Sequence, residues 1–381
     1  LLRPETLAAL LAEHARTGAA ATLLTSVVSD PSGYGRVIRS SSGGEVLRIV
    51  EDRDASAEEL EVAEISALVY AFDSVPLREA VARLSTENSQ GEQYLPEVIS
   101  IFVAAGLPVR ALVADQEQTA GVNDRVQLAH AHRAYNARLL ERHMRAGVTV
   151  IDPATTWVDA GVELEPDVTL LPSVELHGAT YVAEGAHIGP QVTLTDTSVG
   201  ARSRLSRTVA VSARVGADVT VGPFAYLRPG TDLADGVHIG TYVEVKNSDI
   251  GLASKVPHLS YVGDASIGEH TNIGAATVFV NYDGVDKHRS SIGDHARTGA
   301  DNMFVAPVQV GDGAYTAAGS VITQDVPPGA MGVARAAQRN VGGWVARKRP
   351  GTPAALAAEA ALNAPSETTN APSETTEDED E

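Results

Sequence analysis

Residues 215–245 read VGADVTVGPFAYLRPGTDLADGVHIGTYVEV, and an aliphatic residue returns at every sixth position of this stretch. An earlier stretch keeps the same spacing from Leu164 to Leu194, and many of the aliphatic residues are followed by glycine, as in Ile239-Gly240. A period of six fits neither the helical repeat of 3.6 nor the alternation of a plain strand. It is typical of a hexapeptide β-helix, in which stacked coils bury one aliphatic residue per hexad. The repeat therefore predicts a left-handed parallel β-helix with three hexads in each coil.

Length and composition limit the classes of protein to be considered. A chain of 381 residues suggests more than one folded part. The absence of cysteine excludes disulfides and thiolate metal sites and is compatible with a reducing cytoplasm. A net charge of −20 argues against a nucleic-acid-binding surface, and no stretch approaches the 18 apolar residues of a membrane span. We expect a cytoplasmic protein that acts on small molecules.

Three further segments accompany the repeat. Alternating strand and helix patterns over residues 1–124 predict an α/β domain of the Rossmann-like type, and residues 125–146 predict an exposed linker helix before a β-helix over 147–349. Because the α/β pattern starts in its middle and contains no Gly-rich phosphate loop, we expect the second half of a larger domain. Residues 350–381 repeat NAPSETT and end on five acidic residues, which predicts a disordered acidic tail.

The hexad spacing fails between Ile273 and Ile292. An insertion that leaves a coil stack at a corner projects as a loop, and such loops usually form the binding face of a solenoid. We therefore expect ligand chemistry at this insertion.

Five segments resemble one known family in order and spacing: residues 227–230 (LRPG), 243–247 (VEVKN), 258–265 (HLSYVGDA), 272–275 (NIGA) and 281–287 (NYDGVDK). They resemble the bifunctional N-acetylglucosamine-1-phosphate uridyltransferase/glucosamine-1-phosphate acetyltransferases of bacterial cell-wall synthesis. The resemblance runs from about Leu1 to Arg349. It implies acetyl transfer from acetyl-CoA to glucosamine 1-phosphate, giving N-acetylglucosamine 1-phosphate, by a homotrimer whose sites lie between neighbouring subunits.

His258 is the candidate catalytic residue. Acyl transfer to a sugar amine needs a base of near-neutral pKa, and histidine is the usual choice; in the similar family, the matching histidine is the general base. Arg228 and Lys246 are separated by three hexads, which make one full coil, so their side chains should converge as a phosphate clamp.

The resemblance also implies two sets of binding residues. Those for glucosamine 1-phosphate are Arg228, Lys246, Tyr261, Asn272 and Lys287. Those for acetyl-CoA are Ala275, Asn281, Tyr282, Ala300, Ala318 and Arg335. Ala300 stands where the family usually carries a serine, and one lost neutral hydrogen bond, worth about 0.5 to 1.5 kcal/mol, predicts weaker coenzyme binding rather than loss of activity.

The N-terminal part resembles the second half of the uridyltransferase domain. The resemblance implies that Gly35 and Glu51 touch the sugar nucleotide and that Asn123 ligates Mg²⁺. Ser66 replaces an asparagine that binds the sugar in the family. Because the phosphate loop and a second metal-binding carboxylate belong to the first half, we expect no useful uridyl transfer from these residues alone.

Two other classes remain for comparison. A β-helix carbonic anhydrase needs zinc on three histidines with a close-spaced pair, and His258, His270, His288 and His295 do not show that spacing. A non-catalytic trimeric scaffold would need neither His258 nor the cationic pair. A thiol-release assay separates the enzyme from the scaffold.

Overall fold

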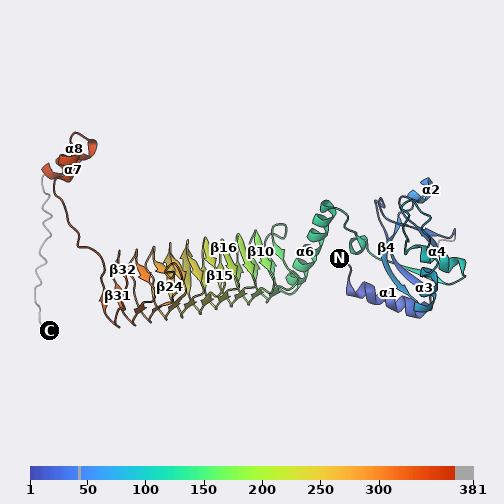
Figure 1. Cartoon of the computed structure of the whole chain (residues 1–381), viewed down its shortest axis with the longest axis horizontal. Coiled ribbons are helices and arrows are strands. Elements are labelled where there is room, and N and C mark those ends of the chain that lie inside the picture. Colours follow the sequence, from blue (N-terminus) through green and yellow to red (C-terminus); the bar gives the residue numbers. More distant parts are fainter. Residues whose placement is uncertain (42–43, 365–381) are drawn as a thin grey trace, which may run out of the picture. The chain divides into compact units, whose positions relative to one another are not determined.

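The computed structural model describes residues 1–41 and 44–364. The chain divides into a compact unit spanning Leu1–Gly332 and a second unit that begins at Val333. The first unit contains an α/β part followed by a β-helix, whose coils stack in sequence order from those next to α6 to those that carry β31 and β32 (Figure 1).

The α/β part is built on a five-stranded sheet in the order β3-β2-β4-β1-β5. Its strands are β1 (Ala21–Val27), β2 (Arg36–Arg39), β3 (Val46–Val50), β4 (Glu64–Phe72) and β5 (Val109–Val113). Its helices are α1 (Pro4–Thr17), α2 (Ala57–Leu60), α3 (Ser74–Val81), α4 (Glu97–Ala104) and α5 (Gln116–Thr119). Strands β1 and β5 are parallel, and the other pairs are antiparallel. Buried aliphatic residues of β1, together with Phe102 of α4, form the core.

Strand β2 is not apparent from the sequence pattern of this part. Strand β2 begins with a charged residue, Arg36, which is nevertheless buried because its guanidinium lies 3.0 Å from the Asp52 carboxylate. A short strand that hides a paired charge lacks the apolar alternation by which strands are recognised.

Helix α6 (Arg125–Arg145) differs from the expected exposed linker. Its second half buries Leu139 and Leu140 within the core of the β-helix, and the buried Asn136 amide bonds the Thr156 carbonyl (2.8 Å) and the Val158 N–H (3.0 Å). The first coil of a solenoid has no preceding coil to cover its core, so a terminal element must cap it. This helix is therefore also the cap of the β-helix.

The β-helix consists of three parallel sheets. The ten-stranded sheet contains, in spatial order, β32 (Val321–Ile322), β29 (Met303–Val305), β27 (Val278–Val280), β25 (Tyr261–Gly263), β22 (Glu244–Lys246), β19 (Ala225–Leu227), β16 (Thr208–Val211), β13 (Val192–Thr195), β10 (Val174–His177) and β7 (Trp157–Val158). The nine-stranded sheet contains β30 (Gln309–Val310), β28 (Ser290–Ile292), β26 (Ala265–Ile267), β23 (Asp249–Ile250), β20 (Asp232–Leu233), β17 (Arg214–Val215), β14 (Ser198–Val199), β11 (Tyr181–Val182) and β8 (Glu163–Leu164).

The third sheet has seven strands: β24 (Lys255–His258), β21 (His238–Thr241), β18 (Thr220–Val221), β15 (Arg204–Leu205), β12 (His187–Ile188), β9 (Thr169–Leu170) and β6 (Thr149–Val150). Single bridges at Asn272 and Arg297 continue this face to the pair β31 (Tyr315–Thr316) and β33 (Met331–Gly332). The left-handed parallel β-helix expected from the hexads is thus confirmed.

The hexad residues form one continuous core. Leu227, Leu233, Ile239 and Val245 are fully buried, and each lies in register with its counterpart one coil away, as Leu227 does with Val245. Each such side chain contributes about 1.5–3 kcal/mol relative to an exposed one. The glycines that follow them allow close stacking, because a Cβ on Gly240 would lie 1.8 Å from the Pro257 carbonyl oxygen.

The second unit corrects the expected C-terminal boundaries. The β-helix unit ends at Gly332 rather than at Arg349, and α7 (Trp344–Lys348) and α8 (Pro353–Asn363) follow. Helix α8 lies within the stretch expected to be disordered. The Thr352 hydroxyl accepts the N–H of Ala355 as an N-cap, and the run AALAAEAAL has strong helix propensity. Residues 365–381, which include the acidic run at the C-terminus, lie outside the described residues.

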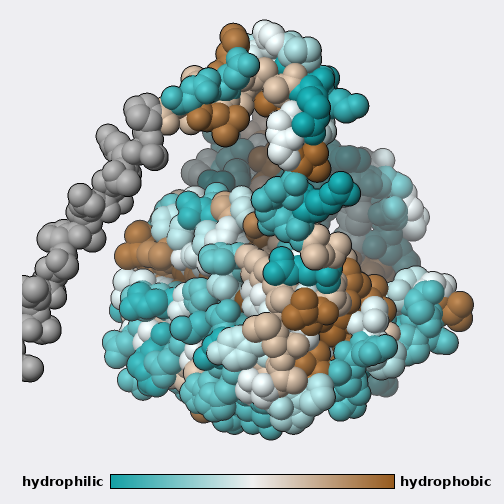
Figure 2. All heavy atoms as spheres, turned by 90° about the vertical axis from the view of Figure 1, so that its left-hand side faces the viewer, coloured by the Kyte–Doolittle hydropathy of each residue, from teal (hydrophilic) through white to brown (hydrophobic). Residues whose placement is uncertain are grey.

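Hydrophilic residues cover much of the face seen in Figure 2, with smaller groups of hydrophobic residues between them. No helix among the described residues is long and apolar enough to cross a membrane.

Candidate active site

The expected site residues gather at the two edges of the ten-stranded sheet. Each coil passes from the seven-stranded sheet through a corner into the ten-stranded sheet, and through a second corner into the nine-stranded sheet. His258 and Leu259 form the first corner on one coil, and Asp264 forms the second. The candidate base and the candidate cations therefore lie at opposite edges of one sheet.

The first edge carries His258 and the three alanines expected to contact acetyl-CoA. The N–H of Ala276 bonds the His258 carbonyl (3.2 Å), that of Asp301 the Ala275 carbonyl (2.7 Å) and that of Gly319 the Ala300 carbonyl (2.9 Å). Ala275, Ala300 and Ala318 thus lie on successive coils, which are about 4.8 Å apart. The structure brings these residues together with His258 along a corner of small side chains.

These small side chains follow from tight stacking of the corner. A Cβ on Gly274 would lie 2.2 Å from the Gly299 carbonyl oxygen, and one on Gly299 would lie 2.4 Å from the Ala318 nitrogen. Glycine is therefore needed at these two positions. Ala300 accordingly follows a glycine required by backbone packing, and compared with the serine expected at that position it lacks only the hydroxyl group.

The second edge carries Lys246, whose ammonium lies 3.0 Å from the Asp264 carboxylate. Asp264 also accepts hydrogen bonds from the side-chain amides of Asn247 (2.6 Å) and Asn281. The hydrogen bond from Lys246 to Asp264 raises the pKa of the lysine, which keeps its positive charge at neutral pH. The cation is therefore held in place before any ligand arrives.

Arg228 lies one coil before Lys246, as their spacing of three hexads predicted. The register pairs Leu227 with Val245, which places the two cations on neighbouring coils. The Arg228 guanidinium donates to the Glu244 carboxylate at 2.8 Å. Each cation is thus paired with its own carboxylate, a feature that the spacing alone did not show.

Tyr261 lies between the two edges, in register with Glu244. Its hydroxyl is close to Gly263, where a Cβ would lie 2.3 Å from it, and accepts a hydrogen bond from the Asn281 amide at 3.3 Å. The tyrosine therefore depends on a glycine two residues later for its orientation.

The inserted loop, residues 281–289, follows β27 and carries Tyr282 and Lys287, which form an antiparallel bridge. Asp283 stabilises the turn: its carboxylate accepts the N–H groups of Val285 (2.8 Å) and Asp286 (2.7 Å) and contacts the His288 imidazole (2.7 Å). The hydrogen bond with His288 is the main cause that lowers the pKa of Asp283 to about 2. The ring of Tyr282 is exposed, and its hydroxyl donates to the Gly284 carbonyl.

A pocket of about 650 Å³ lies where this loop meets the second edge. Its lining consists of Pro229, Gly230, Lys246, Asn247, Asp264, Lys287, His288 and Arg289. The lining includes Lys246, Lys287 and Arg289, of which Lys246 is paired with Asp264 and Arg289 with the Asp249 carboxylate. Its composition suits a phosphate group.

Of the residues expected to bind glucosamine 1-phosphate, Lys246 and Lys287 line this pocket, whereas Arg228, Tyr261 and Asn272 do not. Asn272 lies on the face of the seven-stranded sheet, bridged to Lys255 and Arg297. Arg335 belongs to the second compact unit.

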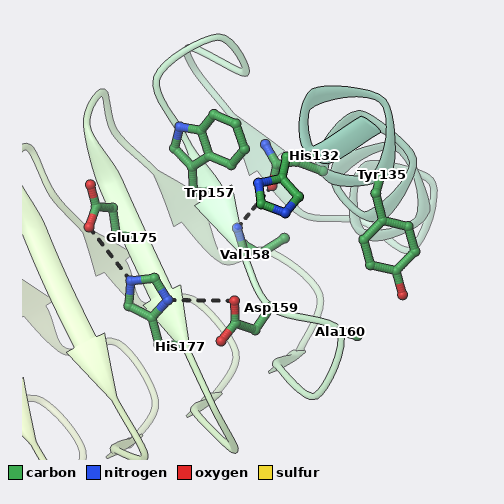
Figure 3. A pocket seen from close by; sticks show the side chains of 9 residues that line it. His132, Tyr135, Trp157, Val158, Asp159, Ala160, Glu175 and His177 are labelled. Carbon is green, nitrogen blue, oxygen red and sulfur yellow. Dashed lines mark hydrogen bonds and ion pairs between the residues drawn. The ribbon is translucent and has the colours of Figure 1, made fainter. Parts of the chain in front are cut away.

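A second pocket of about 510 Å³ lies between α6 and the first coils (Figure 3). His132 and Tyr135 line it from the helix, and Trp157 lines it from β7. His177 lies between two carboxylates, 3.5 Å from Asp159 and 3.6 Å from Glu175. The residues expected to bind the sugar phosphate or the coenzyme are absent from its lining, so the loop pocket is the better candidate for the acetyl-transfer site.

The expected sugar-nucleotide residues of the α/β part are partly gathered. The N–H of Ser66 bonds the Gly35 carbonyl (2.9 Å), and a Cβ on Gly35 would lie 3.3 Å from the Glu51 carboxylate. Burial, followed by the charges of Asp54 and Asp52, raises the pKa of Glu51.

Asn123, the expected metal ligand, lies just before the start of α6. The N–H of Asn123 donates to the Gln127 side chain at 2.6 Å. Within residues 1–41 and 44–364, no three His, Asp or Glu side chains come together as a metal site. No reaction step is therefore assigned to a metal.

Asp264 and Asn247 are site residues that were not expected from the sequence. Both lie within the segments that carry the resemblance, on consecutive coils. The register of neighbouring coils places them at one corner, which is the signal that could have identified their contact.

The relatives of this chain match almost all of its length. It is 58% identical over 361 residues to the Bifunctional protein GlmU of Streptomyces coelicolor, covering 94% of this chain and 75% of that protein. It is 56% identical over 370 residues to the Bifunctional protein GlmU of Kineococcus radiotolerans, covering 97% and 75%. The chain belongs to the GlmU family. The family expected from the motifs is thereby confirmed, and with it the class of enzyme, a transferase.

A family model also matches part of the repeat. Residues 290–324 match the hexapeptide repeat of succinyl-transferase. Among solved structures, UDP-N-acetylglucosamine acyltransferase from Campylobacter jejuni is 18% identical, with a TM-score of 0.31, covering 56% of this chain and 83% of that one. This TM-score is too low to bear on function, so the assignment to the GlmU family depends on the sequence relatives.

Proposed function

We propose that the β-helix transfers the acetyl group of acetyl-CoA to the amine of glucosamine 1-phosphate, as a member of the GlmU family that supplies N-acetylglucosamine 1-phosphate for cell-wall synthesis. The observation that carries this proposal is the placement of His258 beside a corner of stacked alanines, with a pocket lined by Lys246 and Lys287 at the other edge of the same sheet.

His258 acts as the general base. The amine nitrogen attacks the thioester carbonyl carbon, and the imidazole accepts the proton that the nitrogen loses. The carbon–sulfur bond then breaks, and the departing sulfur takes a proton to become the CoA thiol. The products are N-acetylglucosamine 1-phosphate and CoA, and atoms and charge balance without a redox step.

The two edges hold the two substrates. Lys246 and Lys287, with Arg228 one coil away, bind the phosphate of the sugar, and Tyr261 contacts the sugar between the edges. From His258 to Ala318 the corner covers three coil spacings of about 4.8 Å, or roughly 14 Å, which suits an extended pantetheine arm. Tyr282, exposed on the inserted loop, and Asn281 at its base contact the thioester end.

The acting assembly is a homotrimer in which the ten-stranded sheet faces a neighbouring subunit. The outward residues of this sheet form a column in register, here called the outer column of the ten-stranded sheet: Trp157, Glu175, Thr193, Val209, Tyr226, Glu244, Tyr261, Val278, Met303 and Val321. Val209, Tyr226, Met303 and Val321 are exposed in the single chain. A row of exposed apolar side chains is typical of a protein interface.

The protein acts in the cytoplasm, where its cysteine-free composition and its small-molecule substrates fit. The α/β part contributes Gly35, Glu51 and Ser66 to a sugar-nucleotide surface. Uridyl transfer is an activity that the family resemblance implies, and the residues of the α/β part do not by themselves account for a step of it.

Release of the CoA thiol tests the proposal. The purified chain should release thiol from acetyl-CoA only when glucosamine 1-phosphate is present, and His258→Ala should abolish most of that release. A chain that releases no thiol with this amine, or a His258→Ala variant with unchanged turnover, would contradict it.

A further inference from the structure

We propose that Asp264 is a positioning residue for acetyl transfer, which holds Lys246 and both ends of the inserted loop in the geometry that receives glucosamine 1-phosphate. This inference rests on the proposed function, because it takes Lys246 as a ligand of the sugar phosphate.

The Asp264 carboxylate is the meeting point of three donors. Lys246 approaches its oxygens at 3.0 and 3.2 Å, and the amides of Asn247 and Asn281 donate to it as well. These donors come from the preceding coil and from the start of the inserted loop. One carboxylate therefore joins three segments of the pocket.

The backbone of Asp264 adds two further links. Its N–H bonds the Lys246 carbonyl at 3.0 Å, and its carbonyl accepts the N–H of Ser290 at 3.2 Å. Asn281 begins the inserted loop, and Ser290 follows its end. Asp264 thus holds the loop at both ends, while Tyr282 and Lys287 lie on the part between them.

Burial distinguishes this ion pair from the others on the β-helix. The side chains of Lys246 and Asp264 are 17% and 9% exposed, whereas those of Arg202 and Asp218 are 64% and 53% exposed. Exposed pairs are weak because water and salt screen them. Removing one partner of a buried pair leaves an uncompensated charge and is costly.

The carboxylate remains charged despite this burial. Burial by itself would raise the pKa of Asp264, but the hydrogen bonds from Asn247, Lys246 and Asn281 leave that pKa below its ordinary value. Asp264 is therefore ionised at neutral pH and can hold an ammonium group at all times.

A fixed lysine is useful for binding a phosphate. A free lysine has a flexible four-carbon stem, and ordering it on binding costs affinity. Asp264 has already ordered Lys246, so the phosphate meets an ammonium group in place. Loss of the carboxylate should therefore raise the KM for the sugar phosphate and leave the coenzyme corner at the other edge of the sheet unaffected.

The matched pair Asp264→Asn and Asp218→Asn tests this expectation. Both aspartates occupy left-handed corners, with φ of 50° and 57°, a conformation that asparagine also tolerates, and both accept an ion pair. Asp264→Asn should raise the KM for glucosamine 1-phosphate about 10- to 100-fold, the range for a lost hydrogen bond to a charged group. Its KM for acetyl-CoA should change little, and Asp218→Asn should change neither KM.

A double-mutant cycle shows whether Asp264 acts through Lys246. If it does, Asp264→Asn combined with Lys246→Ala should raise the KM for the sugar phosphate by less than the product of the two single effects. Fully additive increases would overturn the inference, as would a parallel rise in both KM values, which is the signature of a purely structural role.

Two further results keep the inference separate from the proposed function. If Lys246→Ala leaves the KM for glucosamine 1-phosphate unchanged, both fail; if only Asp264→Asn leaves it unchanged, the inference alone fails. Should Asp264→Asn not fold, Asn247→Gly removes one contact of the carboxylate and keeps the left-handed backbone at φ 45°. This variant should raise the same KM about 3- to 10-fold, less than Asp264→Asn because the carboxylate keeps its charge and its other two donors, and an unchanged KM would overturn the inference.

Discussion

The ten-stranded and nine-stranded sheets share one backbone repeat and one core, yet their outer faces differ completely. The outer column of the ten-stranded sheet is largely apolar or aromatic and is interrupted by Glu175, Thr193 and Glu244. The nine-stranded sheet presents in register Glu163, Tyr181, Ser198, Arg214, Asp232, Asp249, Ser266, Ser291 and Gln309. There the guanidinium of Arg214 donates to Asp232 at 2.8 Å.

This difference shows how a hexapeptide repeat separates stability from function. The inward residue of each hexad must be aliphatic, because it fills the axis of the stack. The outward residues are free of that constraint, so one face can carry a site and an interface while another carries solvated ion pairs. Changes on the ten-stranded sheet should therefore affect activity, and equivalent changes elsewhere should not.

The largest contrast is expected at the first edge. His258→Ala should lower kcat for acetyl transfer by about two to four orders of magnitude, the usual value of a positioned base, with little change in either KM. His187→Ala, an outward histidine of the seven-stranded sheet, is the control and should keep full activity. Steady-state kinetics measure both variants, and equal kcat values for the two would remove His258 from the mechanism.

Substitutions at the second edge should affect substrate binding. Arg228→Ala and Lys246→Ala should each weaken the binding of glucosamine 1-phosphate by about 1.5 to 3 kcal/mol, the range for a hydrogen bond to a charged group. Binding of acetyl-CoA should change little. Calorimetric titration with each substrate measures both effects, with Arg214→Ala on the nine-stranded sheet as the control. Equal weakening of both substrates would indicate a destabilised coil.

The interface should be sensitive to charge. Val209→Glu places a carboxylate in the outer column two coils before Glu244. Burying an unpaired polar group costs about 1 to 3 kcal/mol, so the trimer should dissociate at about 5- to 100-fold higher protein concentration. Ser198→Glu makes the same change on the nine-stranded sheet. Light scattering over a dilution series compares the dissociation of the two variants. A wild-type monomer with full activity would refute the trimer.

The smallest effect concerns the turn of the inserted loop. The pKa of Asp283 is about 2, below its ordinary value, so its ionised form stabilises the turn above that ordinary value and this contribution is lost as the pH falls through about 2. His288→Ala should move the titration of Asp283 back toward its ordinary value while the fold persists. Carbon-detected NMR titration of the carboxyl group measures this, and an unchanged midpoint would mean that the backbone N–H groups alone hold the charge.

Local periodicity explains how much of the site could be predicted. Arg228 and Lys246 were placed on neighbouring coils because three hexads make one coil. Ala275, Ala300 and Ala318 were expected from the family resemblance alone, and the structure places them on successive coils. The contact between Asp264 and Asn281 could not be predicted in this way, because the insertion after β27 breaks the period on which such counting depends.

The amino-acid sequence by itself determined the β-helix, its axis residues, its inserted loop and its family, because a six-residue period and short motifs are local properties of the chain. Only the tertiary structure decided that α6 caps the first coil, that Lys246 is held by a buried carboxylate and that β2 hides Arg36 beside Asp52. These features depend on side chains that meet across coils or across the sheet, and their energies depend on burial, which no local pattern records.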